Sequence, residues 1–223
     1  MKKNLSSIFH RPSSIKNKRI LITCGPTWVA IDDVRVISNR STCELGHMLA
    51  KALCASKAKV TLLEGPVTHS FGFKGIKVHK FCFFDELAVL LSKELKNRYD
   101  CVIHAAAVSD FKPHRSFSKK IKSNSKFSLD LVPLPKLINT IKATAPDTFL
   151  VGFKLESRLN NASAVRETKT LFSQARCDLV VANFMKSGGY EALVLDANKS
   201  LLGKAKSKRE LAHLMVQILN DKL

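Results

Sequence analysis

Five polar side chains follow apolar runs of the sequence at points where a parallel sheet would bring them together. They are Asn39, Ser41, Asp110, Lys120 and Asn183. The Asn39 amide can donate to a carbonyl or oxyanion, Lys120 offers a charge for a phosphate, and Asp110 can accept from a ribose hydroxyl or bind magnesium. Such a set suits activation of a carboxylate by a nucleotide. The ordinary alternative for a loop Lys near a loop Asp is a solvated surface pair.

Residues 34–53 form a polar, hydroxyl-rich loop that runs directly into an apolar-periodic helix. Ser41 or Thr42 is expected to cap this helix. The unpaired N–H groups of its first turn and the positive end of its dipole would then favour a phosphate or a developing oxyanion. A capped surface helix without a ligand has the same pattern, so the alternative stays open.

Other signatures of nucleotide binding and nucleophilic catalysis do not occur in the sequence. The turn Gly25-Pro26-Thr27 supplies one glycine where the dinucleotide-binding fingerprint needs three. No Walker lysine follows a glycine loop, and no Gly-x-Ser-x-Gly is present. The sequence therefore does not support NAD, P-loop or serine-nucleophile chemistry.

The cysteines are scattered, without a Cys-x-x-Cys pair or a Cys/His spacing typical of metal sites. We therefore assign no protein side chain as a metal ligand. Reduced, mostly buried thiols of a cytoplasmic protein are expected. The six residues are Cys24, Cys43, Cys54, Cys82, Cys101 and Cys177.

Length and composition predict one globular unit, since 223 residues with 45% hydrophobic residues can bury one substantial core. Residues 1–18 are basic and lack the apolar stretch of a secretory signal, so we expect a flexible tail followed by a single α/β domain over 19–223. The apolar runs are far shorter than the ~20 residues of a membrane-spanning helix. No membrane partner is expected.

The net charge is +19, from 37 Lys and Arg against 18 Asp and Glu. Such a charge attracts polyanions, so a nucleic-acid binder is one alternative. The basic residues, however, are spread over the whole chain, and no basic platform studded with aromatic residues occurs. We therefore expect no specific nucleic-acid partner, only weak binding that disappears as salt rises. Small phosphorylated substrates account for the charge equally well.

Apolar runs alternate with amphipathic segments along the chain. Expected strands cover 19–24, 59–63, 76–81, 100–107, 127–131, 148–153, 178–182 and 192–195. One expected helix ends near residue 53, and three others cover 85–97, 137–143 and 162–175. A last helix is capped by Ser207. Nearly continuous apolar strands alternating with helices predict a doubly wound α/β fold, with a mainly parallel sheet and helices on both faces, Rossmann-like in its ribokinase-like variant. Such sheets bind ligands at the carboxyl ends of their strands.

Six motifs in order resemble those of phosphopantothenate-cysteine ligase. They are GPT at 25–27 with IDDVR at 31–35, ISNRST at 37–42, AAAVSDF at 105–111, KIK at 120–122, VGFKLE at 151–156 and VAN at 181–183. The resemblance spans about residues 19–220. It is similar to the stand-alone bacterial form, which has no flavin-binding decarboxylase domain before it.

The resemblance implies a ligase that joins 4'-phosphopantothenate to L-cysteine in coenzyme A synthesis. The carboxylate would attack the α-phosphate of CTP and release pyrophosphate, and the cysteine amine would then displace CMP from the acyl cytidylate. It also implies a homodimer that needs Mg²⁺. ATP replaces CTP in some members, chiefly eukaryotic ones, and the sequence does not decide between them.

Roles for individual residues are also implied by the resemblance. The catalytic residues would be Asn39, which holds the acyl intermediate, and Lys120, which holds the triphosphate. The nucleotide-binding residues would be Gly25, Ala105, Ala106, Asp110, Lys120, Pro135, Lys136, Leu137, Ile138 and Phe153. The substrate-binding residues would be Arg35, Ser38, Asn39, Ser41 and Asn183.

The sequence departs from the family pattern in three places. Cys43 replaces a glycine, and if that position needs a positive φ, its Cβ costs about 1–2 kcal/mol. Leu171 and Ala175 replace lysines, and the segment between Asn183 and Ala192 is short. These departures leave open a second hypothesis, a degenerate nucleotide-binding relative with weak or no ligase activity.

Overall fold

Nearly continuous apolar runs form the central strands of an eight-stranded sheet. The computed structural model describes residues 15–68, 72, 74–115, 117–122, 124, 126–156, 161–186 and 189–223. The strand order is β12-β11-β10-β9-β6-β1-β4-β5. The strands are β1 (Arg19–Cys24), β4 (Lys59–Glu64), β5 (Lys77–Lys80), β6 (Cys101–His104), β9 (Phe149–Glu156), β10 (Leu179–Lys186), β11 (Gly189–Asp196) and β12 (Leu201–Ala205).

The sheet has the topology of a doubly wound fold. Strands β5, β4, β1, β6, β9 and β10 are parallel, whereas β11 and β12 add to the β10 edge as antiparallel strands. In chain order the parallel strands are arranged 3-2-1-4-5-6, so the strand order reverses between β1 and β6. Ligands bind at such a switch point, outside the carboxyl ends of the strands. The predicted Rossmann-like, mainly parallel sheet is confirmed.

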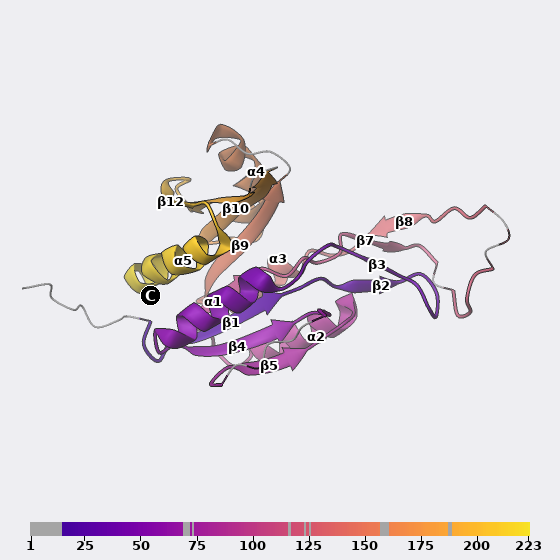
Figure 1. The fold of residues 1–223 in the computed structure, drawn as a ribbon, viewed down its shortest axis with the longest axis horizontal. Coiled ribbons are helices and arrows are strands. Elements are labelled where there is room, and N and C mark those ends of the chain that lie inside the picture. Colours follow the sequence, from indigo (N-terminus) through magenta and orange to yellow (C-terminus); the bar gives the residue numbers. More distant parts are fainter. Residues whose placement is uncertain are drawn as a thin grey trace, which may run out of the picture.

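Helices cover both faces of the sheet (Figure 1). They are α1 (Glu44–Ala55), α2 (Phe84–Leu95), α3 (Leu137–Thr144), α4 (Asn161–Ser173) and α5 (Lys208–Lys222). Successive residues of a strand point to opposite faces of the sheet. Ile22 therefore packs with α1 and α5, whereas Leu21 packs with α2 and α3. Ser207 caps α5 as predicted, since its hydroxyl accepts a hydrogen bond from Glu210 N. None of the helices in the described ranges is long and apolar enough to cross a membrane.

Two short hairpins project from the carboxyl edge of the sheet and lie side by side (Figure 1). They pair β2 (Trp28–Ala30) with β3 (Val36–Ser38), and β7 (Phe111–Pro113) with β8 (Leu131–Pro133). We call residues 28–38 and 111–133 the arm. The expected strand at 127–131 is wrong in its bounds, because only the segment from Leu131 pairs with β7.

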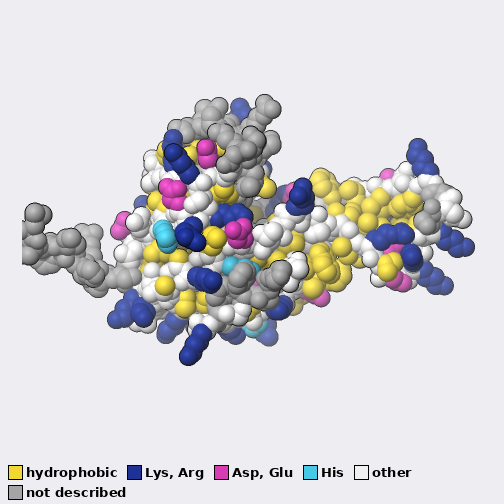
Figure 2. Space-filling view, in the orientation of Figure 1, with side chains coloured by type: hydrophobic (Ala, Val, Ile, Leu, Met, Phe, Trp, Pro, Cys, Tyr) yellow, Lys and Arg dark blue, Asp and Glu magenta, His cyan; other side chains and the backbone are white. Residues whose placement is uncertain are grey.

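Hydrophobic side chains lie exposed on the arm, where they form the yellow surface at the right of Figure 2. Their exposed fractions range from 37% at Phe117 to 64% at Val34. The exposed hydrophobic residues of the arm are Val34, Val36, Phe111, Phe117, Phe127 and Leu131. An apolar surface of this kind is typical of a region that contacts another molecule.

Two predicted boundaries need correction. The ordered domain begins before residue 19, because Ile15 is fully buried and its backbone N–H donates to Asn220 Oδ1 at 3.4 Å. The rest of the predicted tail, residues 1–14, lies outside the described residues. Asn183 lies inside β10 and not after its end, since antiparallel pairing with β11 extends that strand to Lys186. The short segment before Ala192 is therefore a hairpin.

Candidate active site

The turns that follow β1 and β6 are joined at the switch point. Ala107 N–H donates to Gly25 O at 2.8 Å, and Ala105 N–H donates to Thr23 O at 3.0 Å. Gly25 has a φ of 87°, and a Cβ there would lie only 2.6 Å from Cys43 Sγ. Glycine thus lets this buried turn pack against Cys43 and Gly65, whereas Ala105 and Ala106 are partly exposed. The structure brings the predicted nucleotide-binding residues Gly25, Ala105 and Ala106 together.

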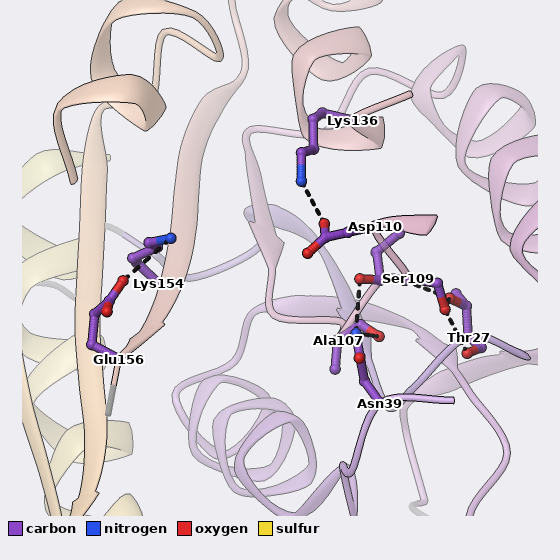
Figure 3. A network of polar contacts seen from close by, with 9 residues as sticks. Thr27, Asn39, Ala107, Ser109, Asp110, Lys136, Lys154 and Glu156 are labelled. Carbon is purple, nitrogen blue, oxygen red and sulfur yellow. Dashed lines mark hydrogen bonds and ion pairs between the residues drawn. The ribbon is translucent and has the colours of Figure 1, made fainter. Parts of the chain in front are cut away.

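Two buried hydroxyl groups join the two hairpins at the base of the arm (Figure 3). Ser109 N–H donates to Thr27 Oγ1 at 2.9 Å, Thr27 Oγ1 donates to Ser109 Oγ, and Ser109 Oγ donates to Thr27 O, the last two at 3.1 Å. The start of the β2 hairpin is therefore tied to the start of the β7 hairpin. This junction lies next to the turns at the switch point.

Asn39 follows β3 and points at the β6–β7 connection (Figure 3). Its Nδ2 donates to Ala107 O at 3.3 Å and to Val108 O at 3.0 Å. Because both carbonyls take the amide donors, Oδ1 is the group that can face a ligand, and it suits an amine or hydroxyl. The predicted role toward an oxyanion would require Nδ2 to leave one carbonyl. Ser38 ends β3 and Ser41 is half-buried in the loop after Asn39, and Ser38 Oγ donates to Asn39 O.

Asp110 forms an ion pair with Lys136, not with Lys120 (Figure 3). Both side chains are more than half exposed. Lys136 is the N-cap of α3, where the adjacent Pro135 is exposed. The next two residues, Leu137 and Ile138, bury their side chains in the core, so they can offer a nucleotide only backbone groups. The segment 135–138 and Asp110 thus lie together, as predicted for the nucleotide site.

Lys120 lies on the arm, in a segment held by Asp32 and Arg35. Ile121 N–H donates to Asp32 Oδ2 at 3.0 Å, and Arg35 Nη2 donates to Ile121 O at 3.0 Å. Arg35 Nη1 also donates to Asp32 Oδ2 at 2.9 Å. Arg35, predicted to bind substrate, here positions the segment that carries Lys120. The Ile121 N–H, the N–H groups of Val34 and Arg35 and the Arg35 guanidinium lower the pKa of the Asp32 carboxyl.

Replacing Asp32 with alanine is expected to release this segment. The backbone N–H of Ile121 loses its acceptor, so its hydrogen exchange should become faster, and kcat/KM of the proposed reaction should fall about 10- to 100-fold through misplacement of Lys120. Hydrogen exchange with peptide resolution and steady-state kinetics measure both effects. Asp33→Ala, at the exposed neighbouring position, is the matched control. Equal effects of the two substitutions would contradict the positioning role.

Phe153, Lys154 and Asn183 lie within β9 and β10, where these strands extend past the end of β6. Phe153 is half-buried near the carboxyl end of β9, the strand beside β6. Lys154 forms an ion pair with Glu156 at 3.2 Å (Figure 3), and sequence reasoning missed it as a candidate cation for a phosphate. The sequence contained a signal for Lys154, because a lysine near the carboxyl end of a buried strand lies at the edge of the sheet where ligands bind. Within the described ranges, no hydrogen bond joins Asn183 to the other predicted residues.

The start of α1 differs from the prediction. Its N-cap is Cys43, with a φ of 59° and no side-chain capping bond, so the expected cap at Ser41 or Thr42 is wrong. The left-handed backbone conformation of Cys43 directs the chain into α1, and no polar side chain accepts a hydrogen bond from the first turn of the helix. Cys43 thus has a positive φ, a conformation that costs a non-glycine residue about 1–2 kcal/mol. The Cys43 thiol lies 2.8 Å from the Cys24 thiol, its hydrogen-bond donor.

A buried histidine at the end of β6 stays neutral. His104 Nδ1 lies 3.0 Å from Thr23 Oγ1, which accepts a hydrogen bond from Ala106 N–H. The Thr23 hydroxyl thus links the ring of His104 to the backbone of the Ala106 turn. Burial lowers the pKa of His104 from 6.5 to about 4. His104 therefore supports the Ala106 turn without carrying charge at neutral pH.

This lowered pKa predicts acid sensitivity. The unfolded chain binds a proton at His104 below about pH 6.5 and the folded chain only below about pH 4, so the contribution to stability is complete above pH 6.5 and is lost as pH falls to 4. The free energy of unfolding should fall by up to about 1.4 kcal/mol per pH unit in this window. Urea denaturation of the wild type and His104→Asn should show a difference that shrinks with acidification. His213→Asn, at an exposed position, should leave the pH dependence unchanged.

Comparison with known proteins identifies the family. Residues 15–221 match the family model described as the DNA/pantothenate metabolism flavoprotein C-terminal domain. The chain belongs to this family. The coenzyme A biosynthesis bifunctional protein CoaBC of Thermococcus kodakarensis is 37% identical over 182 residues, and that of Borreliella burgdorferi is 32% identical over 187 residues. Each alignment covers 81% of the chain but 44% and 46% of the relatives, so the chain spans less than half of their length.

Solved structures of the family have the same fold. The DNA/pantothenate metabolism flavoprotein from Streptococcus pneumoniae aligns with a TM-score of 0.83 and 24% identity, covering 92% of this chain and 100% of that one. A Cab2 mutant in complex with phosphopantothenate-cysteine aligns with a TM-score of 0.76 and 19% identity, covering 93% and 87%. Together with the CoaBC relatives, the family confirms the resemblance to phosphopantothenate-cysteine ligases seen in the sequence.

Proposed function

We propose that this protein joins 4'-phosphopantothenate to L-cysteine through an acyl-nucleotidylate intermediate, a step of coenzyme A biosynthesis. The main support is the convergence of Asn39, Asp110 and the turns at Gly25 and Ala105 on one switch point, in a family whose relatives are CoaBC proteins. In this proposal the substrate carboxylate attacks the α-phosphate of CTP and pyrophosphate leaves. The cysteine amine then attacks the acyl carbon, and CMP leaves with the bonding electron pair.

The residues of the site have separate tasks in this reaction. Gly25 keeps the turn after β1 packed against Cys43 and Gly65, and the partly exposed backbone at Ala105 and Ala106 contacts the nucleotide. Lys120, Lys136 and Lys154 supply positive charge for the triphosphate. Asn39 Oδ1 accepts an N–H of the attacking cysteine amine, because its Nδ2 is held by Ala107 O and Val108 O. The anchored amide therefore orients the nucleophile in the second half of the reaction.

Magnesium is part of the proposal, and Asp110 is the residue that fits it. Mg²⁺ prefers oxygen ligands and is commonly held by one or two carboxylates together with substrate phosphates. The exposed Asp110 carboxylate lies beside Lys136 at the nucleotide edge, so both the carboxylate and the neighbouring cation meet a triphosphate there. The metal would supply charge neutralisation for the leaving pyrophosphate.

A three-component turnover assay tests the function. CMP and pyrophosphate should form together only when CTP, 4'-phosphopantothenate and L-cysteine are all present, and a parallel assay with ATP decides the nucleotide. The control omits cysteine, so that acyl-nucleotidylate formation is measured alone as pyrophosphate release. A folded protein that forms neither product with either nucleotide would refute the proposal.

A second candidate function is a degenerate nucleotide-binding relative. The observations that favour it are the strained N-cap at Cys43 and the burial of Ala175, which is 1% exposed at one of the family's lysine positions. Cys43→Gly removes the strain and separates the two functions. A large gain in turnover would favour decay from an active ancestor, whereas little change would favour a tolerated variant.

We also propose that two copies of the chain form a homodimer through the arm. The exposed hydrophobic residues of the arm lie on two adjacent hairpins, a self-complementary surface that a second copy could cover. Sedimentation equilibrium should give twice the chain mass, and a monomer at all concentrations would contradict the dimer.

The free cysteines of the described chain fit a reducing compartment, so we place the protein in the cytoplasm.

A further inference from the structure

A cluster of potential metal ligands lies buried beneath the turn after β1. The side chains of Cys24, Cys43 and His47 each place one ligand atom within 4.8 Å of the others. All three residues are buried, with exposed fractions of 1%, 3% and 3%. They come from the end of β1, the N-cap of α1 and its first turn, so the fold, not local sequence, assembles the cluster.

Each ligand is positioned by a feature of the backbone. Cys43 and His47 are four residues apart and therefore lie on the same side of α1, where His47 N–H donates to Cys43 O at 2.9 Å. Gly46 lets this turn approach β1 so closely that a Cβ there would overlap the Cβ of Cys24. The left-handed N-cap at φ 59° turns the Cys43 sulfur toward Cys24.

A buried carboxylate completes the arrangement. Glu64 ends β4 as the register partner of Cys24, so the two side chains emerge on the same face of the sheet. Its Oε1 lies 2.6 Å from His47 Nε2, and Glu64 is 1% exposed. Histidines that bind metals are commonly oriented by a carboxylate on the other ring nitrogen. Glu64 is thus placed to orient His47 from the ring nitrogen Nε2, outside the group of three potential ligands.

The chemistry of these groups selects a particular class of cation. Two thiols and an imidazole form the ligand set of open zinc sites, and sulfur ligands favour zinc over magnesium or calcium. Two thiolates would neutralise a divalent charge, which makes burial of the ion acceptable. A strained backbone conformation persists where the surrounding structure requires it. Cys43 has such a conformation at a position where glycine would be unstrained, which is consistent with a function for its thiol.

We propose that Cys24, Cys43 and His47 bind one thiophilic divalent cation, Zn²⁺ being the physiological form, with Glu64 behind His47. The site lies directly under the Gly25 turn, since a Cβ on Gly25 would meet Cys43 Sγ. The cation fastens the start of α1 to the ends of β1 and β4. This site is separate from the Mg²⁺ proposed at Asp110, and it does not depend on the proposed ligase activity.

Cobalt titration of the reduced, chelator-treated full chain tests the site. Co²⁺ should bind once per chain with thiolate-to-cobalt charge-transfer absorbance and the intense visible bands of a tetrahedral site, and one equivalent of Zn²⁺ should remove both. Cys43→Gly should weaken zinc binding at least 100-fold. This variant suits the positive φ and is expected to fold. Cys54→Ser, a thiol change in the same helix outside the cluster, should bind as the wild type does.

Thermal unfolding gives a second readout. Zn²⁺ should raise the melting temperature of the wild type and of Cys54→Ser, but not that of Cys43→Gly or His47→Gln. Saturable binding with sulfur charge transfer that is lost only in cluster variants supports the proposal. Failure of the reduced wild type to bind one Co²⁺, or equal loss in Cys54→Ser, overturns it. A Cys24–Cys43 disulfide together with no metal binding after reduction also overturns it.

Discussion

Replacing Asn39 with alanine is expected to lower formation of the cysteine amide by about 100-fold, the lower end of the loss seen when one polar group aimed at a reacting atom is removed. Three contacts disappear together: that of Oδ1, which would face the amine, and the bonds from Nδ2 to Ala107 O and to Val108 O. Nucleotide binding should change little, because the turns at Gly25 and Ala105 remain joined by their own backbone bonds.

The partial reactions separate these effects. Pyrophosphate release without cysteine reports acyl-nucleotidylate formation, and product formation with cysteine reports the second step. Asn39→Ala should slow the second step far more than the first. Thr42→Ala, an exposed change in the same loop, is the control and should keep both rates. Equal losses in the two steps would show that Asn39 holds the β6–β7 connection without orienting the amine.

Replacing Gly46 with alanine is expected to produce the largest loss of stability. The new Cβ would overlap Cys24 Cβ and lie 2.9 Å from Cys24 Sγ, so α1 must move away from β1. Overpacking a buried contact costs about 3 kcal/mol at the upper end of its usual range, which corresponds to a fall of roughly 6–12 °C in melting temperature. The better helix propensity of alanine offsets only about 1 kcal/mol of this.

A double-mutant cycle identifies the cause of that loss. Cys24→Gly removes the opposing Cβ, so Gly46→Ala should cost less in the Cys24→Gly background than in the wild type. Cys24→Ser keeps the Cβ and should give no relief. Gly72→Ala is the matched control, because a Cβ at Gly72 meets nothing within 4 Å. Additive effects of Cys24→Gly and Gly46→Ala would contradict a clash between these two residues.

The central sheet was predictable because its strands carry a strong signal. Runs such as β1 and β9 are apolar over most of their length, and burial on both faces requires that composition. The arm was missed because β2, β3 and β7 have three residues each, too few to show an alternating pattern. Their pairing is determined by contacts at the base of the arm, not by propensity.

The sequence suggested candidate site residues, but it did not show which of them pair. Strand ends placed Asn39 and Asp110 at the same edge, as the structure does. The partner of Asp110 is Lys136, 26 positions away, and not the nearer Lys120. Separation in the sequence does not predict which lysine contacts Asp110, because the β7–β8 hairpin brings Lys136 back to the carboxylate and leaves Lys120 on the arm. The sequence showed no Cys/His spacing typical of a metal site, because Cys24 joins Cys43 and His47 only through the packing of α1 on β1.

The packing of α5 beside α1 has a consequence for the order of folding. Ile15, α1 and α5 share one hydrophobic core, although 205 positions separate Ile15 from Asn220. During synthesis, α1 can form early, but the face of the sheet beside it cannot close until residues 208–222 leave the ribosome. Until then β1 and β4 present an apolar surface on that side. Chaperone contact during translation should therefore persist until α5 emerges.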